Sequence, residues 1–398
     1  MNNSDPALFG SAPPKPSIWN DPFYRSLFFQ FSAFVVVVLL GKYLFDNTTE
    51  NMARQGIASG FGFMGSVSGF DVTSSLVKYS ASSTYGQAFL VGLLNTLLVS
   101  AVSIFLATMI GFMVGIARLS SNWLIAKMAT VYIEVLRNIP LLLQIFFWYF
   151  AVLRPLPSPR QSLDLFDMVF VNNRGLYLPA PVFDDLAIWL LIAVVVAIAL
   201  IIFLTRWAKR KQDETGETFP LFLTSVSLLI GLPLLALLAT GFPVHWEMPV
   251  LQGFNFRGGL TLIPEFVALT LALSTYTAAF IAEVVRAGIQ AVPKGQTEAA
   301  NALGLRSGVI LRQVVIPQAM RVIVPPLTNQ YLNLTKNSSL AAAIAYPDLV
   351  LIFAGTVLMQ TGQAVEIIFI TMAVYLLISL SIALFMNWYN KRMMLVER

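Results

Sequence analysis

The chain has 398 residues, of which 57% are hydrophobic and only 11% are charged, and its formal net charge is +5. Soluble domains carry about 25% charged residues, so this composition excludes an ordinary soluble protein and predicts an all-α polytopic membrane protein. The absence of cysteine excludes disulfides and thiolate metal sites, and the single histidine, His245, disfavours a multi-histidine metal centre. The positive charge is interpreted by its placement relative to the membrane, and no nucleic-acid partner is expected.

A helix needs about 20 mostly apolar residues to cross a bilayer. Residues 1–26 are polar and contain several prolines, which predicts a short flexible tail. The apolar run 27–45 is too long for the hydrophobic region of a signal peptide, and no A-x-A-type site follows it, so we expect a span that is not cleaved. Eight spans are predicted in all, the others being 87–116, 130–153, 185–205, 219–240, 263–285, 322–357 and 366–390.

Prolines in two of these spans predict irregular helices. Pro140 predicts a kink in the third span. Pro325 and Pro326 are followed by the polar run NQYLNLTKNSSL, so the seventh span is predicted to be interrupted there.

Composition also suggests how the chain is divided. An extra N-terminal span and outer segment occupy 27–86, and the outer part, 46–86, mixes Ser, Gly and Thr with apolar residues, so we expect it to pack on the outer membrane surface. Segment 154–262 has two spans with few polar groups inside them. It is predicted to be an insertion into a core formed by 87–153 and 263–390.

Lysine and arginine are enriched in the cytoplasmic loops of membrane proteins. With the N-terminus inside, the inner segments hold 16 basic residues in 95 and the outer segments hold 6 in 94. Both termini, including the tail 391–398, are therefore predicted to be cytoplasmic. The inner segments are 1–26, 117–129, 206–217, 286–321 and 391–398, and the outer segments are 46–86, 154–184 and 241–262.

One predicted cytoplasmic stretch, TEAANALGLRSGVILRQVVIP at 297–317, is polar and helix-forming. Pro293 suits the first turn of a helix, and Gly304 is placed to end that helix in a left-handed cap. Ser307 is expected to cap a second short helix, which Pro317 ends. These residues alone leave two interpretations open: a helix that docks another protein, or a connector that lies on the headgroups.

Polar residues inside spans are costly and mark function by default. Lys336 lies in a run of amides and hydroxyls beside the predicted break, where it is either a substrate ligand or a structural lock. Asn95 and Thr96 are either contacts between helices or ligand contacts. The substrate-path candidates are Thr275, Tyr276, Asn333, Lys336, Asn337 and Ser338.

Three further charged residues are predicted to have structural or interface roles. Glu283 and Arg286 are three residues apart on one helix and are expected to pair with each other near its inner end. Arg137 is expected to extend its side chain toward the inner interface.

Several motifs resemble those of a known family. The pattern E-A-A-x3-G-x9-V-x-I-P, from Glu298 to Pro317, resembles the EAA loop of ABC importer permeases, whose usual ending is I-x-L-P. Three other stretches resemble the polar amino-acid permeases of the histidine and glutamine type, and two resemble the general L-amino-acid permease subgroup. The first three are 132–150, 266–296 and 334–349, and the other two are 51–64 and 88–100.

The resemblance implies a type I ABC importer permease with five core spans, in the bacterial inner membrane. It implies that the EAA loop, here 293–317, is a coupling helix that fits a cleft on an ATP-binding subunit. The coupling residues would be Glu298, Ala299, Ala300, Gly304, Arg306 and Pro317.

The same resemblance implies the partners. These are two ATP-binding subunits, a periplasmic amino-acid-binding protein and a second, related permease, with a heterodimer favoured; the substrate is an L-amino acid and the surroundings are membrane lipid. The sequence contains no G-x4-G-K-[ST] motif, so we expect no cofactor on this chain and expect ATP and Mg²⁺ to be bound by the partner ATPase.

Three other classes of protein fit the residues less well. A membrane enzyme needs a catalytic constellation, and none is recognisable. A secondary transporter is expected to bury acids for ion coupling, and mid-span acids are essentially missing from the predicted spans. A channel has no use for a docking loop. The polar loop and the missing coupling acids therefore favour a subunit that is driven by another protein. The family resemblance implies import by alternating access and leaves the amino-acid spectrum undefined.

Overall fold

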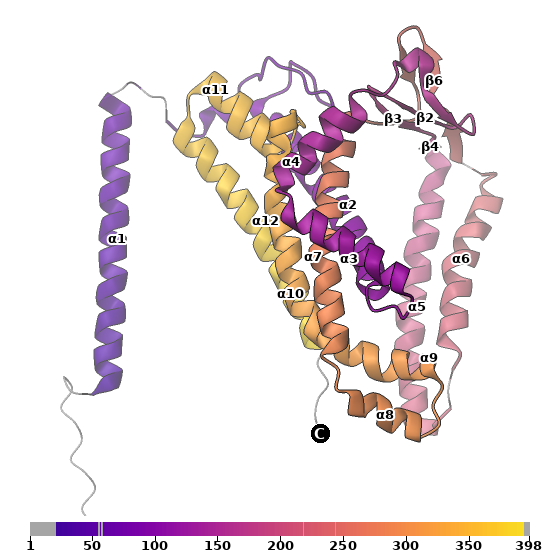
Figure 1. The fold of residues 1–398 in the computed structure, drawn as a ribbon. Helices are drawn as coiled ribbons and strands as arrows, with labels where there is room; N and C mark the ends of the chain where they lie inside the picture. Colours follow the sequence, from indigo (N-terminus) through magenta and orange to yellow (C-terminus); the bar gives the residue numbers. More distant parts are fainter. Residues whose placement is uncertain (1–20, 55, 57–58, 218, 243, 394–398) are drawn as a thin grey trace, which may run out of the picture.

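The structure is a computed structural model that describes residues 21–54, 56, 59–217, 219–242 and 244–393. The predicted tails therefore lie mostly outside the described residues. The helices are α1 Pro22–Arg54, α2 Tyr85–Ala117, α3 Trp123–Asn138, α4 Leu141–Phe146, α5 Ile188–Thr215, α6 Leu221–Ala239, α7 Pro264–Gln290, α8 Lys294–Ala302, α9 Ser307–Ile310, α10 Ile316–Asn337, α11 Leu358–Thr361 and α12 Ala364–Met393 (Figure 1).

Seven helices in the described part of the chain are long and apolar enough to cross a membrane, and the bent pair of α3 with Leu141–Leu153 is together long and apolar enough for one broken span. The structure thus confirms a mostly helical polytopic membrane protein. Turns of other pitch join several of the helices: Phe147–Leu153, Leu311–Val315 and Val350–Val357 are π-helical, and Ser338–Ile344 is a 3₁₀ helix.

Pro140 breaks the third crossing far more sharply than a kink. Helix α3 and the following segment Leu141–Leu153 meet at 106°. The break leaves carbonyl groups at the end of α3 without helical partners. The Gln144 side-chain amide donates to two of them, Leu136 O and Ile139 O, both at 2.9 Å. This amide therefore stabilises the bend inside the membrane region, where water is scarce.

The predicted seventh span is interrupted, but not at Pro325 and Pro326, because α10 continues through both prolines and ends at Asn337, within the polar run. Proline is tolerated inside membrane helices where neighbouring groups satisfy the carbonyls that its missing amide frees. The chain instead leaves the helix at Ala345, which has a left-handed φ of 59°. The predicted seventh span is therefore α10 followed by a separate short helix, 350–361.

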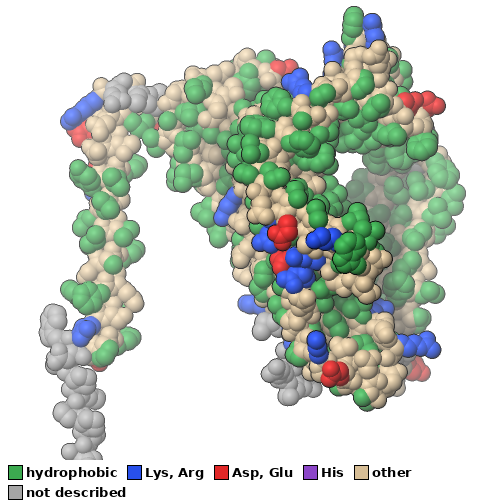
Figure 2. Space-filling model, in the orientation of Figure 1, with side chains coloured by type: hydrophobic (Ala, Val, Ile, Leu, Met, Phe, Trp, Pro, Cys, Tyr) green, Lys and Arg blue, Asp and Glu red, His purple; other side chains and the backbone are tan. Residues whose placement is uncertain are grey.

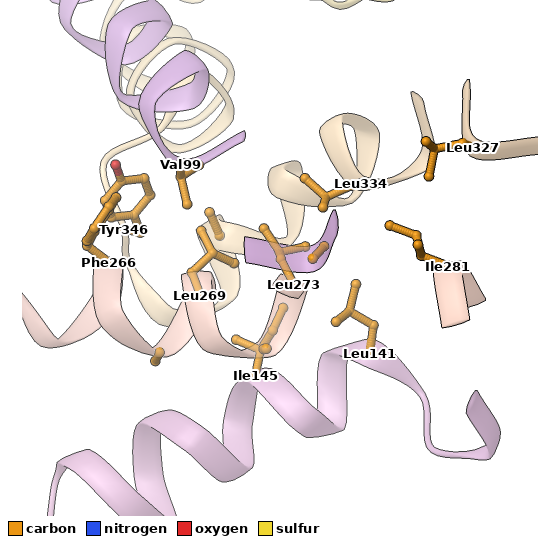
Figure 3. Close-up of a cluster of buried hydrophobic side chains, with 14 of the residues drawn as sticks. Val99, Leu141, Ile145, Phe266, Leu269, Leu273, Ile281, Leu327, Leu334 and Tyr346 are labelled. Carbon is orange, nitrogen blue, oxygen red and sulfur yellow. The ribbon is translucent and has the colours of Figure 1, made fainter. Parts of the chain in front are cut away.

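Helix α7 is at the centre of the hydrophobic core. Its inward residues, such as Leu269 and Leu273, pack between Ile145 of α4 and Val99 of α2 (Figure 3). Helix α2 approaches α7 closely through Gly115, where an added Cβ would lie 2.7 Å from Ala282 O. By contrast, α1 lies apart from the other helices (Figure 1), and its most apolar stretch has no buried residue.

The sequence interpretation missed a group of short strands, which we call the β lobe. It caps one end of the helices in Figure 1. One sheet has the order β1-β2-β3-β8, and β4–β5 and β6–β7 are two-stranded. The strands are β1 Leu163–Leu165, β2 Val169–Asn172, β3 Gly175–Leu178, β4 Ala180–Phe183, β5 Val244–Glu247, β6 Val250–Gln252, β7 Asn255–Arg257 and β8 Leu260–Leu262.

Residues on both sides of the α5–α6 hairpin build this lobe. Tyr177 packs against Phe256 with ring centroids 4.9 Å apart, and its hydroxyl donates to Asn255 at 2.7 Å. Burial in this contact raises the pKa of Tyr177. The two loops of the predicted insertion therefore form one folded unit.

The expectation that 46–86 packs on the membrane surface is also wrong in part. Phe63 is buried among side chains of the protein itself, with its ring 6.2 Å from that of Phe353. The Gly60 amide donates to the Glu366 carboxylate at the start of α12. This segment is therefore attached to the core beside the α11–α12 turn.

Candidate coupling loop and substrate path

The segment 293–317 forms the predicted helix, glycine turn and second helix. Helix α8 begins after Pro293 and ends at Ala302, and Gly304 has a left-handed φ of 72°. The Gly304 amide donates to Asn301 O at 2.9 Å and the Leu305 amide donates to Ala300 O at 3.3 Å. These two bonds are those of a Schellman motif, which fixes the direction of the turn.

The turn presents apolar side chains away from the rest of the chain. Leu303 is 79% exposed and Ala300 is only 5% exposed, so one face of α8 rests on the protein and its end is free. Glu298, Ala299 and Arg306 are also exposed. A Cβ added at Gly304 would meet nothing within 4 Å, so this glycine is needed for its backbone conformation and not for space.

Two details of the predicted loop are wrong. Ser307 is the first residue of α9, and Arg306 occupies the cap position without a side-chain hydrogen bond. Pro317 does not end the second helix but lies in the first turn of α10. The preceding turn is π-helical, with the Ile316 amide bonded to Leu311 O, and such a wide turn accommodates the proline ring without a helix break. The loop is consequently continuous with α10.

The predicted pair of Glu283 and Arg286 is present near the loop end of α7. Arg286 Nε donates to Glu283 at 3.1 Å. The same carboxylate also binds Arg118 from the end of α2, and Arg118 lies 3.8 Å from Glu134 of α3. These four residues form one ion-pair cluster that joins α2, α3 and α7. Figure 2 shows acidic and basic side chains together on this face of the molecule.

Arg137, on α3 close to this cluster in sequence, is exposed and its guanidinium lies over the Phe280 ring at 5.1 Å. The charges of α3 are partly accessible, since the Glu134 side chain is 58% exposed. Exposed charges at membrane depth are unfavourable against lipid. This face is therefore suited to water or another protein.

Helix α2 holds the break after α10 through the two polar residues whose role the sequence left open. The Asn95 amide donates to Pro347 O at 2.8 Å, and the Leu349 amide donates to the Thr96 hydroxyl at 3.0 Å. Asn95 and Thr96 are both buried. Asn95 and Thr96 therefore connect α2 to the chain after α10, so they are structural contacts and not ligand contacts.

A buried acid at this break corrects the expectation that such acids are missing. Asp348 is fully buried, and its carboxylate accepts the Leu351 amide at 2.8 Å and lies 3.5 Å from the Tyr375 hydroxyl. It caps the short helix 350–361. The sequence interpretation overlooked Asp348 because its only signal was one acid after Pro347, outside any helical pattern.

The polar residues before the break divide by exposure. Ser338 is buried and bonds to Thr335 O at 2.7 Å, as expected for a structural hydroxyl. Asn333 and Lys336 are exposed and Asn337 is half-buried. Lys336 lies at an open cavity of about 460 Å³. That cavity is also lined by Ser339, Val350, Thr371, Met372, Tyr375, Leu376 and Ser379.

Thr275 and Tyr276 lie in a different environment, facing α3. The Thr275 hydroxyl bonds within its own helix to Leu271 O at 2.7 Å, and the Tyr132 hydroxyl donates to Thr275 O at 2.8 Å. Tyr276 packs on Phe280. The structure therefore assigns the Thr275 hydroxyl a local partner, whereas Lys336 faces open space.

Comparisons with known proteins identify the family. Residues 214–395 match the family described as the inner membrane component of binding-protein-dependent transport systems. Across 95% of its length, the chain is 58% identical to a putative amino-acid ABC transporter permease of Escherichia coli, and the alignment covers 96% of that protein. Across 95% of its length it is also 54% identical to AapQ, the permease of a general L-amino acid transport system in Rhizobium johnstonii, and covers 94% of AapQ.

A third relative is more distant. The permease BztB of a glutamate, glutamine, aspartate and asparagine transport system in Rhodobacter capsulatus is 42% identical over 95% of this chain and 96% of its own length. The alignments with these three relatives include the β lobe and the α5–α6 hairpin as well as the core, since almost the whole chain is covered. The chain belongs to the family of amino-acid ABC transporter permeases.

Proposed function

We propose that this chain is one permease half of an importer for a broad range of polar L-amino acids. A periplasmic binding protein delivers the amino acid to the β-lobe side. Two ATPase subunits, which bind ATP and Mg²⁺, dimerise and move the EAA loop, and a rigid-body shift of the spans exposes the substrate path to one side at a time. This chain itself carries out no bond chemistry.

The exposed turn at Leu303 carries this proposal. A fixed Schellman turn with a free apolar tip is a suitable rigid contact for a cleft on another protein. Because the loop is continuous with α10, displacement of the tip moves a helix that crosses the membrane. The alternative functions are a secondary transporter and a channel without an ATPase. Neither would need a docking loop that is continuous with a membrane-spanning helix.

The charged face of α3 supports a second permease subunit as partner. Arg137 is exposed there, and its charge would be unfavourable against lipid. A related but different permease is the favoured partner, which makes the pore a heterodimer. The two subunits would enclose a polar path between them, with both termini of this chain in the cytoplasm of a bacterial cell and its spans in the inner membrane.

Cross-linking and transport together test the function. A cysteine placed at Leu303 should cross-link to the ATPase subunit in membranes, and a cysteine at Trp246 of the β lobe, 62% exposed, should not. The assembled complex in proteoliposomes should take up L-amino acids only with ATP inside and the binding protein outside. ATP-independent uptake, or no cross-link at Leu303, would exclude the ATPase-driven function.

A further inference from the structure

Helix α7 has a carboxylate near each end, and each belongs to a cluster that contains an arginine from the preceding part of the core. Glu265 lies in the first turn of α7, and Glu283 lies 18 residues further along. At 1.5 Å per residue this separation is about 27 Å, close to the ~30 Å thickness of a bilayer core. The two clusters therefore lie near opposite membrane surfaces.

At the β-lobe end, Tyr149 joins the π-helical segment 147–153 to α7. Its hydroxyl donates to Glu265 at 2.7 Å and accepts from Arg154 at 3.0 Å. The Arg154 guanidinium also lies over the Tyr149 ring at 5.1 Å. Tyr149 is only 4% exposed, so this contact is shielded from water. We call these three residues the outer cluster.

At the loop end, Glu283 binds Arg118 and Arg286, and Arg118 also approaches Glu134. We call these four residues the inner cluster. The stretch 118–154 thus contacts α7 at both ends, and the 106° bend at Pro140 lies between the two contacts. A hinge in this place allows α3 and the segment 141–153 to move separately against a rigid α7.

We propose that the outer and inner clusters are two locks on α7 that open alternately during transport. Opening the outer cluster exposes the substrate path to the β-lobe side, and opening the inner cluster exposes it to the loop side. Tyr149, Arg154 and Arg118 are positioning residues in this scheme and do not contact the substrate. The inference rests on the proposed alternating access and adds the contacts that distinguish its two states.

ATP hydrolysis by the complete complex in proteoliposomes tests the locks. Tyr149→Phe removes both hydrogen bonds of the outer cluster, to Glu265 and from Arg154, and keeps the ring. Because ATP-driven closure of the ATPases must then break less of the outer cluster, hydrolysis without binding protein should rise about fivefold, which corresponds to ~1 kcal/mol. Glu283→Gln removes the inner charge, so the loop side opens more readily and hydrolysis with the loaded binding protein should fall about fivefold.

A matched control is Tyr331→Phe, which removes a tyrosine contact of 2.8 Å to Thr108 between α2 and α10 and should change neither rate. The double variant Tyr149→Phe with Glu283→Gln should return toward wild type, because the two shifts oppose each other. If Tyr149→Phe reduces the yield of complex, Arg154→Gln at an exposed position repeats the outer test.

The direction of the two shifts decides the result. If the two clusters only hold the fold together, both rates should fall in both variants. That outcome, or no change in either variant, would contradict the proposal that the clusters open alternately. A wild-type complex that fails to couple ATP hydrolysis to uptake would instead overturn the proposed function. The two failures are therefore distinguishable.

Discussion

Helices α7 and α5 are both apolar enough to cross a membrane, but α7 is largely buried in the protein and α5 is largely exposed. Helix α7 is buried along most of its length by α2, α3, α4 and α10. Helix α5 buries only Ala197 and Ala208, and its partner α6 buries no residue. The apolar parts of the inserted hairpin α5–α6, residues 188–204 and 228–239, are nevertheless rich in Leu, Ile and Val and contain no polar side chain.

The comparison shows that burial in a membrane protein does not follow hydrophobicity. Lipid tails are as apolar as leucine, so no hydrophobic force drives α5 into the core. Helix α7 packs inside because many of its buried positions are small, including Ala278, Ala282 and Ser274, and these allow close backbone approach between its larger apolar side chains. The most apolar helices are accordingly the ones left for lipid to cover.

The largest expected effect comes from filling the α2–α7 contact. Gly115→Leu places a side chain against Ala282 O and Val285, where even a Cβ would be within 3 Å of both. Overpacking costs about 1–3 kcal/mol, and a backbone carbonyl cannot move aside, so we expect the upper end of that range. The amount of assembled complex in detergent extracts should fall severalfold.

Gly231→Leu is the matched control in α6, because an added Cβ there meets nothing within 4 Å. Its yield should equal that of wild type. Equal losses for both variants would show that α7 and the hairpin do not differ in the way described.

The EAA loop is exposed, as the α5–α6 hairpin is, but substitutions in its turn are expected to impair the protein as strongly as substitutions in the core. Gly304→Val forces a β-branched residue into a left-handed conformation, which costs about 1–2 kcal/mol and disorders the turn. Uptake should fall at least tenfold while the complex still assembles. Gly295→Val in α8, equally unobstructed and without a positive φ, should retain most of the uptake.

The two assays to compare are uptake and recovery of intact complex. Normal uptake by Gly304→Val would remove the coupling role of the turn. Glu298→Lys provides a second check, since intact ATPase docking in that variant would exclude the exposed face of α8 from the interface.

A moderate effect is expected at Lys336, the exposed lysine beside the break. Lys336→Met keeps the length of the side chain and removes the ammonium that could hold a substrate carboxylate. Uptake should fall severalfold with assembly and stimulated ATP hydrolysis retained. Lys209→Met, near the C-terminal end of α5, should have no effect. Loss of the subunit from the membrane would instead identify Lys336 as a structural lock, and wild-type uptake would exclude both roles.

The smallest effect on uptake is expected from single cysteine substitutions in the predicted insertion 154–262, which serve as labelling positions. The chain has no cysteine, so single cysteines can be labelled without background. A cysteine at Ser158 should react with an impermeant thiol reagent in intact cells, and one at Lys209 should be protected, with uptake unchanged in both. The reverse pattern would overturn the proposed orientation.

Features set by local residue chemistry were predictable from the sequence alone. The spans follow from runs of apolar residues, because every span must exclude polar groups from lipid over a fixed length. The turn at Gly304 follows from the unique freedom of glycine at positive φ. The pairing of Glu283 with Arg286 follows from their spacing on one helix. Each of these depends on neighbours in the chain.

Other features depended on residues distant in the chain, and only the tertiary structure decided them. Pro325 lies inside α10 and Pro317 lies in its first turn, because tolerance of a proline in a helix depends on the groups that surround it and not on the local sequence alone. The strands of the β lobe are only three or four residues long, and β3 with β8 and β4 with β5 pair across the α5–α6 hairpin, so these pairs leave no local pattern in the sequence. Arg118 meets Glu283 across 165 residues of sequence for the same reason: contact requires that two helices pack, and their packing is a property of the whole core.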